Sequence, residues 1–140
     1  MGKTIGMQFI QYMAFFEKII GLRTVHCFSY NNVIIFVVKP RIVARAIGEN
    51  GFNIKKLASK LKKKIKIVPA PSGIKDAEKF IAAIVYPVKF KKLLIQNREA
   101  IITASPQSRA MLIGRNKARL EELQNIMKEY FGINKLKIVQ

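Results

Sequence analysis

The chain has 140 residues, half of them apolar, a composition that suits a folded protein of one ordinary domain or two very small ones. Its 26 Lys and Arg residues against 8 Asp and Glu residues give a formal net charge of +18. So large a positive charge opposes compaction by self-repulsion, which a polyanionic partner relieves, and it therefore favours a nucleic-acid ligand.

The number of cysteines bears on the cellular compartment, and the hydropathy of the chain bears on whether it could span a membrane. The single cysteine, Cys27, excludes an internal disulfide and fits a reducing compartment. Apolar stretches such as residues 33–38 are far too short to cross a bilayer, and residues 1–7 show no secretory signal. We expect a cytoplasmic protein that is not membrane-bound and acts as a monomer.

The first half of the chain shows helical spacing of apolar residues before Gly21, an Asn31-Asn32 turn between two apolar runs, and Pro40 at a place that suits a first helical turn. Lysines alternate with apolar residues near its end, as in a half-exposed strand. The predicted elements are a helix over 7–20, strands over 22–30 and 33–38, helices over 40–47 and 52–62, and a strand over 65–68.

Two prolines and a glycine make residues 69–73 a linker, after which the same order of elements repeats. The predicted elements are a helix over 76–86, strands over 88–95 and 99–104, helices over 106–113 and 118–131, and a strand over 136–139. We therefore predict an α+β fold of two domains, residues 1–69 and 70–140, each a three-stranded sheet covered by helices.

The two halves align with an offset of 66 residues. Matching prolines and glycines are more telling than a shared apolar pattern, because each fixes a backbone requirement. The matches are Pro40 with Pro106, Ile47-Gly48 with Ile113-Gly114, Asn50 with Asn116, and Leu57 with Leu123. This pattern indicates an internal duplication.

A Gly-x-x-Gly motif, Gly48-Glu49-Asn50-Gly51, separates the two short helices of the first half. Glycines let the backbone turn sharply and let a sugar-phosphate strand approach without meeting a Cβ atom. Amides at the start of the next helix supply donors, and the helix dipole there favours negative charge. The motif alone also fits a plain helix-turn-helix with a glycine cap; the order of elements around it favours a nucleic-acid loop.

The order helix-strand-strand-helix-GxxG-helix-strand resembles the type II KH domain, and two such domains in tandem resemble archaeal NusA-type transcription factors. Further stretches that look like this family are 12–21, 35–40 and 131–133, so the resemblance covers essentially the whole chain. It implies a protein that binds single-stranded RNA, uses no cofactor, and acts in transcription elongation or termination with RNA polymerase as a potential partner.

Carried over by position, the resemblance implies RNA-binding loops at Gly48, Glu49, Asn50 and Gly51 and at Gly114, Arg115, Asn116 and Lys117. Glu49 departs from the pattern because its carboxylate repels phosphate. Lys117 stands in place of the second glycine: either its Cβ blocks the closest backbone approach or requires a less favourable φ, or its ammonium reaches a phosphate directly. We favour a modified second loop that still binds RNA.

Cationic and apolar residues flank both loops. Residues 39–66 hold ten basic residues and one acid, and basic side chains beside an RNA strand add salt-sensitive affinity. The flanking residues predicted to contact RNA are Arg41, Arg45, Ile47, Lys55, Lys56, Arg109, Ile113 and Arg119. Ile47, Ile54, Ile113 and Leu120 are either groove walls or ordinary core, and Phe52 is the only ring at a loop.

The sequence argues against an enzyme. The neighbours His26 and Cys27 on a predicted strand point to opposite faces, and Asp76 is the only aspartate. Scattered carboxylates form no magnesium site, and there are too few ligands for zinc. Two non-catalytic alternatives remain: a KH protein that binds ribosomal RNA or assists ribosome assembly, and a structural adaptor whose grooves no longer bind RNA.

Overall fold

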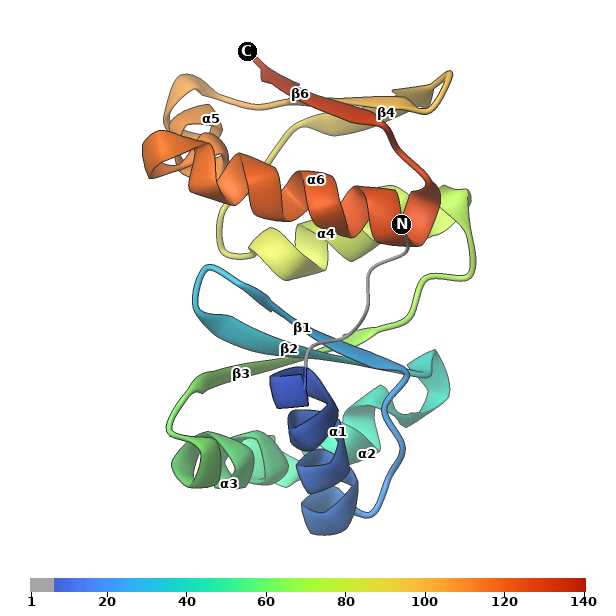
Figure 1. Ribbon diagram of the computed structural model, residues 1–140, viewed down its shortest axis with the longest axis vertical. Helices are drawn as coiled ribbons and strands as arrows, with labels where there is room; N and C mark the ends of the chain where they lie inside the picture. Colours follow the sequence, from blue (N-terminus) through green and yellow to red (C-terminus); the bar gives the residue numbers. More distant parts are fainter. Residues whose placement is uncertain (1–6) are drawn as a thin grey trace. The chain divides into compact units, whose positions relative to one another are not determined.

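The computed structural model describes residues 7–140, which contain six α-helices and two three-stranded sheets. The chain divides into two compact units, one that ends at Ala70 and one of residues 71–140 (Figure 1). Each unit contains one of the sheets, with helices packed on it. The α+β class and the two helix-covered, three-stranded sheets predicted from the sequence are therefore confirmed.

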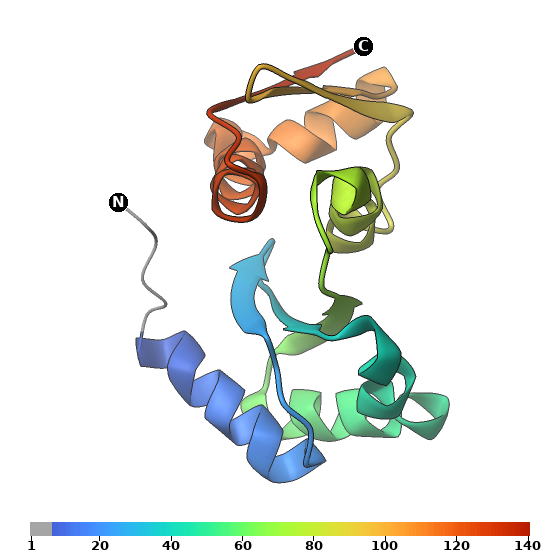
Figure 2. The same ribbon diagram turned by 90° about the vertical axis from the view of Figure 1, so that its right-hand side faces the viewer.

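In the first unit, the middle strand of the sheet pairs antiparallel with the strand before it and parallel with the last strand. The three α-helices all lie on one face of this sheet (Figures 1 and 2). The elements are α1 (Met7–Ile20), β1 (His26–Tyr30), β2 (Val33–Val38), the 3-10 turn η1 (Pro40–Ile42), α2 (Val43–Ile47), the 3-10 turn η2 (Glu49–Gly51), α3 (Phe52–Leu61) and β3 (Lys64–Pro69).

Alternate residues of β2 and one face of each helix form the core of this unit. Phe16 of α1 meets Phe36 of β2 with ring centroids 4.7 Å apart, and both side chains are fully buried. Ala46 of α2 and Leu57 of α3 join the same cluster. Burial of each large side chain contributes about 1.5–3 kcal/mol, which fixes α2 and α3, and the turn between them, on the sheet.

The second unit repeats this order, with β4 and β5 antiparallel and β5 and β6 parallel. Its elements are the 3-10 turn η3 (Ile74–Asp76), α4 (Ala77–Val85), β4 (Lys92–Gln96), β5 (Glu99–Thr103), α5 (Pro106–Ile113), the 3-10 turn η4 (Arg115–Lys117), α6 (Ala118–Phe131) and β6 (Lys135–Val139). α6 is four residues longer than its counterpart α3 (14 against 10 residues).

Aromatic contacts between α4 and α6 and one helix cap hold the second unit's helices in place. Phe80 of α4 lies with its ring centroid 4.7 Å from that of Tyr130 and 6.0 Å from that of Phe131. At the start of α5, the Ser105 hydroxyl accepts a hydrogen bond from the Ser108 amide at 3.2 Å, and Pro106 fills the first turn. The start of α5 is therefore fixed by its own sequence.

Two predicted strands, 22–30 and 88–95, were too long, since β1 begins only at His26 and β4 only at Lys92. The reason lies in the partner strands. β2 and β5 end where a proline opens the next helix, at Pro40 and Pro106. Residues before His26 and Lys92 therefore run past the end of the strand with which they would pair.

Across residues 7–140, no helix is long and apolar enough to cross a membrane. The same residues hold no group of three or more His, Cys, Asp and Glu side chains placed to bind a metal ion. His26 is half-buried on β1, whereas Cys27 is buried in the core, where desolvation raises the pKa of its thiol to about 12.

Candidate nucleic-acid interface

The first loop turns the chain between α2 and α3 through a conformation that requires glycine. Gly48 has φ of 84° and ψ of 162°, a region essentially restricted to glycine. A Cβ atom on Gly48 would also lie 3.0 Å from the backbone nitrogen of Asn53. The Asn53 side-chain amide donates to the Arg45 carbonyl at 3.1 Å, which ties α3 to the end of α2.

The last two residues of the loop are left-handed. Asn50 has φ of 56° and Gly51 has φ of 72°. Asparagine and glycine are the residues that adopt this conformation at least cost. The first hydrogen bond of the turn runs from the Gly51 amide to the Gly48 carbonyl at 3.0 Å. The amides of Glu49 and Asn50 come before this bond in the chain, and both residues are exposed to solvent.

The second loop has nearly the same backbone as the first. Gly114 has φ of 77° and ψ of 169°, and Asn116 has φ of 56°. A Cβ on Gly114 would lie 2.7 Å from Cγ of Arg119 and 3.0 Å from its backbone nitrogen. The Lys117 amide donates to the Gly114 carbonyl at 3.1 Å, as Gly51 does to Gly48 in the first loop.

Lys117 fits the fourth place of its loop by adopting the left-handed conformation, with φ of 61°. The corresponding Gly51 has no atom within 4 Å of an added Cβ, so this place has room for a side chain. The backbone cost for a residue other than glycine is about 1–2 kcal/mol. Lys117 therefore does have the less favourable φ that the sequence suggested for a residue in place of the second glycine. Its side chain is exposed to solvent.

The residues predicted to contact RNA all lie on the two helix-turn-helix segments, and none is fully buried. Those exposed to solvent are Arg41, Arg45, Glu49, Asn50, Lys55, Lys56, Arg115, Asn116 and Lys117. Those half-buried are Ile47, Gly48, Gly51, Arg109, Ile113, Gly114 and Arg119. Both loops are thus open to solvent at their two central positions.

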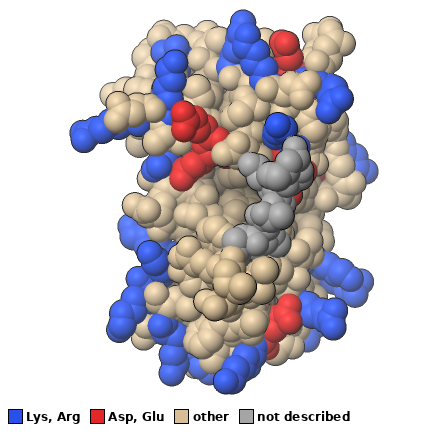
Figure 3. Space-filling model, viewed as in Figure 1, with Lys and Arg blue, Asp and Glu red and all other residues tan. Residues whose placement is uncertain are grey.

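The charge around the two loops differs. Exposed side chains in the first loop contribute one negative charge, from Glu49, and in the second two positive charges, from Arg115 and Lys117. Lys and Arg side chains also outnumber Asp and Glu on the face of the molecule seen in Figure 3. Positive charges attract a phosphate and negative charges repel it, so the four residues of the second loop attract an anion more strongly than the four residues of the first, whose attraction comes from flanking cations such as Arg45 and Lys55.

Two of the predicted cations already have partners inside the second unit. The guanidinium of Arg109, on α5, donates through Nε to the Ile138 carbonyl of β6 at 2.8 Å. The Nε atom of Arg119 forms an ion pair with Glu122 one turn further along α6, at 2.9 Å. The guanidinium groups of Arg109 and Arg119 thus already contact other groups of the second unit, whereas Arg115 and Lys117 are exposed to solvent.

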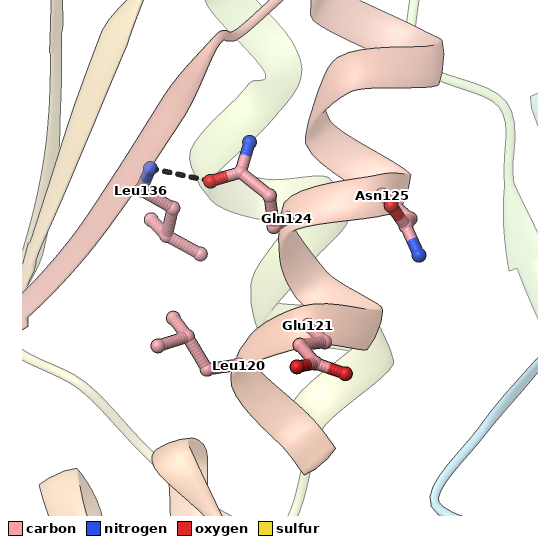
Figure 4. A pocket seen from close by; sticks show the side chains of 5 residues that line it. All are labelled: Leu120, Glu121, Gln124, Asn125 and Leu136. Atoms are coloured by element: carbon pink, nitrogen blue, oxygen red, sulfur yellow. Dashed lines mark hydrogen bonds between the residues drawn. The ribbon is translucent and has the colours of Figure 1, made fainter. Parts of the chain in front are cut away.

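The predicted apolar groove walls have mixed roles. Ile47 and Ile54 are partly buried and pack against the first unit's core. Leu120 instead lines an open pocket of about 350 Å³ between α6 and β6 (Figure 4). Phe52, at the first residue of α3, is 61% exposed, so its ring is accessible beside the first loop instead of packed within the unit.

Gln124 belongs to this region and was missed from the sequence. It lines the same pocket, and its side chain accepts a hydrogen bond from the Leu136 amide of β6 (Figure 4). The same side chain donates to the Ile133 carbonyl. The sequence did contain a signal for Gln124: it is a polar residue four positions after Leu120, on the helix face that otherwise carries the apolar Leu123 and Met127. The partner atoms lie nine and twelve residues away, which a helical pattern alone does not reveal.

No protein-family model matches the chain. Four archaeal proteins, each named probable transcription termination protein NusA, are similar to it over most of its length. That of Methanocaldococcus jannaschii is 29% identical over 134 residues, 93% of this chain and 72% of the relative. That of Methanococcus vannielii is 25% identical, again over 93% of this chain and 76% of the relative.

A solved structure, the crystal structure of APE1850, has the same fold. It superposes with a TM-score of 0.66 and 25% sequence identity, and the match covers 96% of this chain and 99% of the other. Both units therefore have counterparts in a known structure. Together with the four archaeal relatives, this confirms that the chain resembles the archaeal NusA-type transcription factors over nearly its whole length.

Proposed function

We propose that the chain binds single-stranded RNA through two type II KH domains, residues 1–69 and 70–140, and acts in transcription termination or elongation together with RNA polymerase. One observation carries the proposal. Two solvent-exposed loops of the same unusual backbone join paired helices at the same place in each unit, and each loop opens with a glycine at which a Cβ atom would crowd the start of the next helix.

The chemistry of the loops suits a polynucleotide backbone. Amides at the start of η2 and η4 are donors for phosphate oxygens, and the exposed cations on α2, α3 and η4 supply attraction. The ring of Phe52 offers a face for base stacking beside the first loop. A KH loop of this kind clamps about four nucleotides of a single strand.

Binding of fluorescein-labelled octaribonucleotides of different sequence, measured by anisotropy at two salt concentrations, tests the RNA part of the proposal. A 16-base-pair RNA duplex is the comparison ligand. We expect the single strand to bind more tightly and to retain sequence preference at the higher salt. Equal binding of duplex and single strand, with no sequence preference, would show generic charge attraction and contradict the proposal.

Affinity purification of the tagged full chain from its own cells, followed by sequencing of crosslinked RNA, tests the transcription part. The name of the archaeal relatives supports this part. We expect RNA polymerase subunits and nascent transcripts among the recovered molecules. Recovery of ribosomal RNA and ribosomal proteins in their place would overturn the role in transcription while leaving RNA binding intact.

A further inference from the structure

The outer edge of β6 is closed by side chains of its own unit. Within residues 7–140, β6 is an edge strand, since its only neighbour in the sheet is β5. From α6, the Gln124 Oε1 atom accepts from the Leu136 amide at 2.7 Å (Figure 4). Its Nε2 donates to the Ile133 carbonyl at 3.3 Å. One side chain thus occupies a strand donor that an edge strand otherwise presents to a ligand, and a carbonyl of the segment that leads into the strand.

A second side chain closes the same edge further along the strand. Arg109 reaches from α5 and donates through Nε to the Ile138 carbonyl at 2.8 Å. Together, Gln124 and Arg109 occupy three backbone groups within residues 133–138. The pocket beside them also carries Glu121, whose exposed carboxylate repels phosphate.

The first unit has no such side chains at the corresponding places. With the offset of 66 residues that relates the paired helices, Arg109 corresponds to Val43 and Gln124 to Ala58. The strand register matches Val33–Lys64 with Glu99–Lys135, so that Ile65 and Ile67 correspond to Leu136 and Ile138. Because valine and alanine carry no polar side-chain atoms, neither can form hydrogen bonds to the edge of β3.

We propose that Gln124 and Arg109 keep nucleotide bases off the edge of β6, so that the sequence preference of the chain resides in the first unit, at the edge of β3, and the second unit holds RNA mainly by its phosphates. This rests on the proposed function. A base has donors and acceptors on its edge that can pair with strand amides and carbonyls. In the first unit, positions 43 and 58 are valine and alanine, which cannot form hydrogen bonds to the backbone groups of β3. At β6, a base must first displace the side chains of Gln124 and Arg109.

The division fits the loop charges. The second loop, with Arg115 and Lys117, suits phosphate attraction that is independent of sequence, and it joins the two helices, α5 and α6, that contact β6. The first loop, with Glu49 and the exposed ring of Phe52, joins the two helices that contact β3, and these carry the apolar Val43 and Ala58 where the second unit has Arg109 and Gln124. Charge and edge chemistry therefore point to the same assignment in each unit.

The test measures sequence preference, not overall affinity, in the full chain. The probes are four fluorescein-labelled octaribonucleotides, of A, C, G or U alone, and the readout is the ratio of the weakest to the tightest Kd. Each loop is weakened in turn by aspartates, which tolerate the left-handed conformation and repel phosphate. The two backgrounds are Asn50→Asp/Gly51→Asp and Asn116→Asp/Lys117→Asp.

We expect the ratio to fall towards one when the first loop is weakened and to persist when the second loop is weakened. In the first background, Gln124→Ala with Arg109→Val, which copies Ala58 and Val43, should raise the ratio by about three- to tenfold, the equivalent of one net hydrogen bond. In the second background, Ala58→Gln should lower it. Circular dichroism melting confirms that each variant is folded.

The opposite pattern would overturn the inference: a preference that vanishes with the second loop, or uncapping variants that stay folded and leave the ratio unchanged. This failure differs from failure of the proposed function, in which the wild-type chain binds none of the four probes or binds equally well with both loops weakened. A single-residue comparison, Ala58→Gln against Ala58→Ser, separates the capping amide from added polarity alone.

Discussion

Gly51 and Lys117 occupy the same left-handed backbone position in the two loops, with φ of 72° and 61°. One has no side chain and the other has a cation at this position, yet the turn around them is the same. Position 51 is therefore a place where charge can be varied while the fold is held constant.

Gly51→Asp and Gly51→Lys form a matched pair for RNA binding. Both add a Cβ in open space at the same positive φ, so both should cost about 1–2 kcal/mol of stability. Gly51→Asp should weaken binding of a single-stranded octaribonucleotide about fivefold, and Gly51→Lys should tighten it by a similar factor, as unit charges about 4 Å apart in water interact by about 1 kcal/mol. Equal affinity of the two variants would exclude the first loop from the site.

Glu49→Lys should tighten RNA binding, because it replaces the one acidic residue of the first loop by a cation. The slope of log Kd against log salt should steepen by about 0.7 for each additional phosphate that the protein neutralises on a single strand. Glu49→Gln is the control, which removes the repulsion without adding a cation and should leave the slope unchanged. Were Glu49→Lys to leave both affinity and slope at wild-type values, no phosphate would pass this position.

Gly48→Ala and Gly114→Ala should lower the free energy of unfolding by about 2–4 kcal/mol, the sum of an unfavourable φ/ψ and a crowded Cβ. Gly51→Ala, in open space, should cost about 1–2 kcal/mol. Urea unfolding followed by circular dichroism measures all three. If Gly48→Ala were no worse than Gly51→Ala, the first glycine would not be a structural requirement.

The Cys27 thiol should resist alkylation in the folded chain. Burial raises its pKa from 9.0 to about 12, so at pH 8.5 iodoacetamide should modify it only after unfolding in urea. The same shift predicts that stability contributed by this group is intact below pH 9 and falls as the pH rises from 9 to 12, since only the unfolded thiol ionises there. Cys27→Ala should remove that part of the pH dependence; rapid alkylation of the native chain would contradict the burial.

The parts of the fold that the sequence predicted well are those fixed by local signals. Residues 33–38 form a strand with the predicted bounds because a turn precedes them and a proline follows. The bounds of α5 and α6 were also predicted correctly, since Pro106 opens one and Gly132 ends the other. The strands at 22–30 and 88–95 were overextended because their ends depend on where the partner strand stops, which is not a local property.

At the candidate site, the sequence located the loops but not the bonds that cross between elements. Asn116 and Gly114 could be placed from the repeat alone. The hydrogen bonds of Arg109 to Ile138 and of Gln124 to Leu136 join segments 29 and 12 residues apart, and only the fold brings them together. As a result, Arg109 was assigned to RNA without its link to β6, and Gln124 was not considered.

Positions 48 and 114 require glycine, so the opening residue of each loop cannot be replaced without changing the shape of the turn. Glycine has no side chain, so this required residue contributes no charge to the loop. Between the two copies, the residues that differ are Glu49 against Arg115 and Gly51 against Lys117, and they change the loop's charge from −1 to +2 on an unaltered backbone. Two loops of one backbone geometry thereby differ in charge without a compensating change elsewhere in the turn.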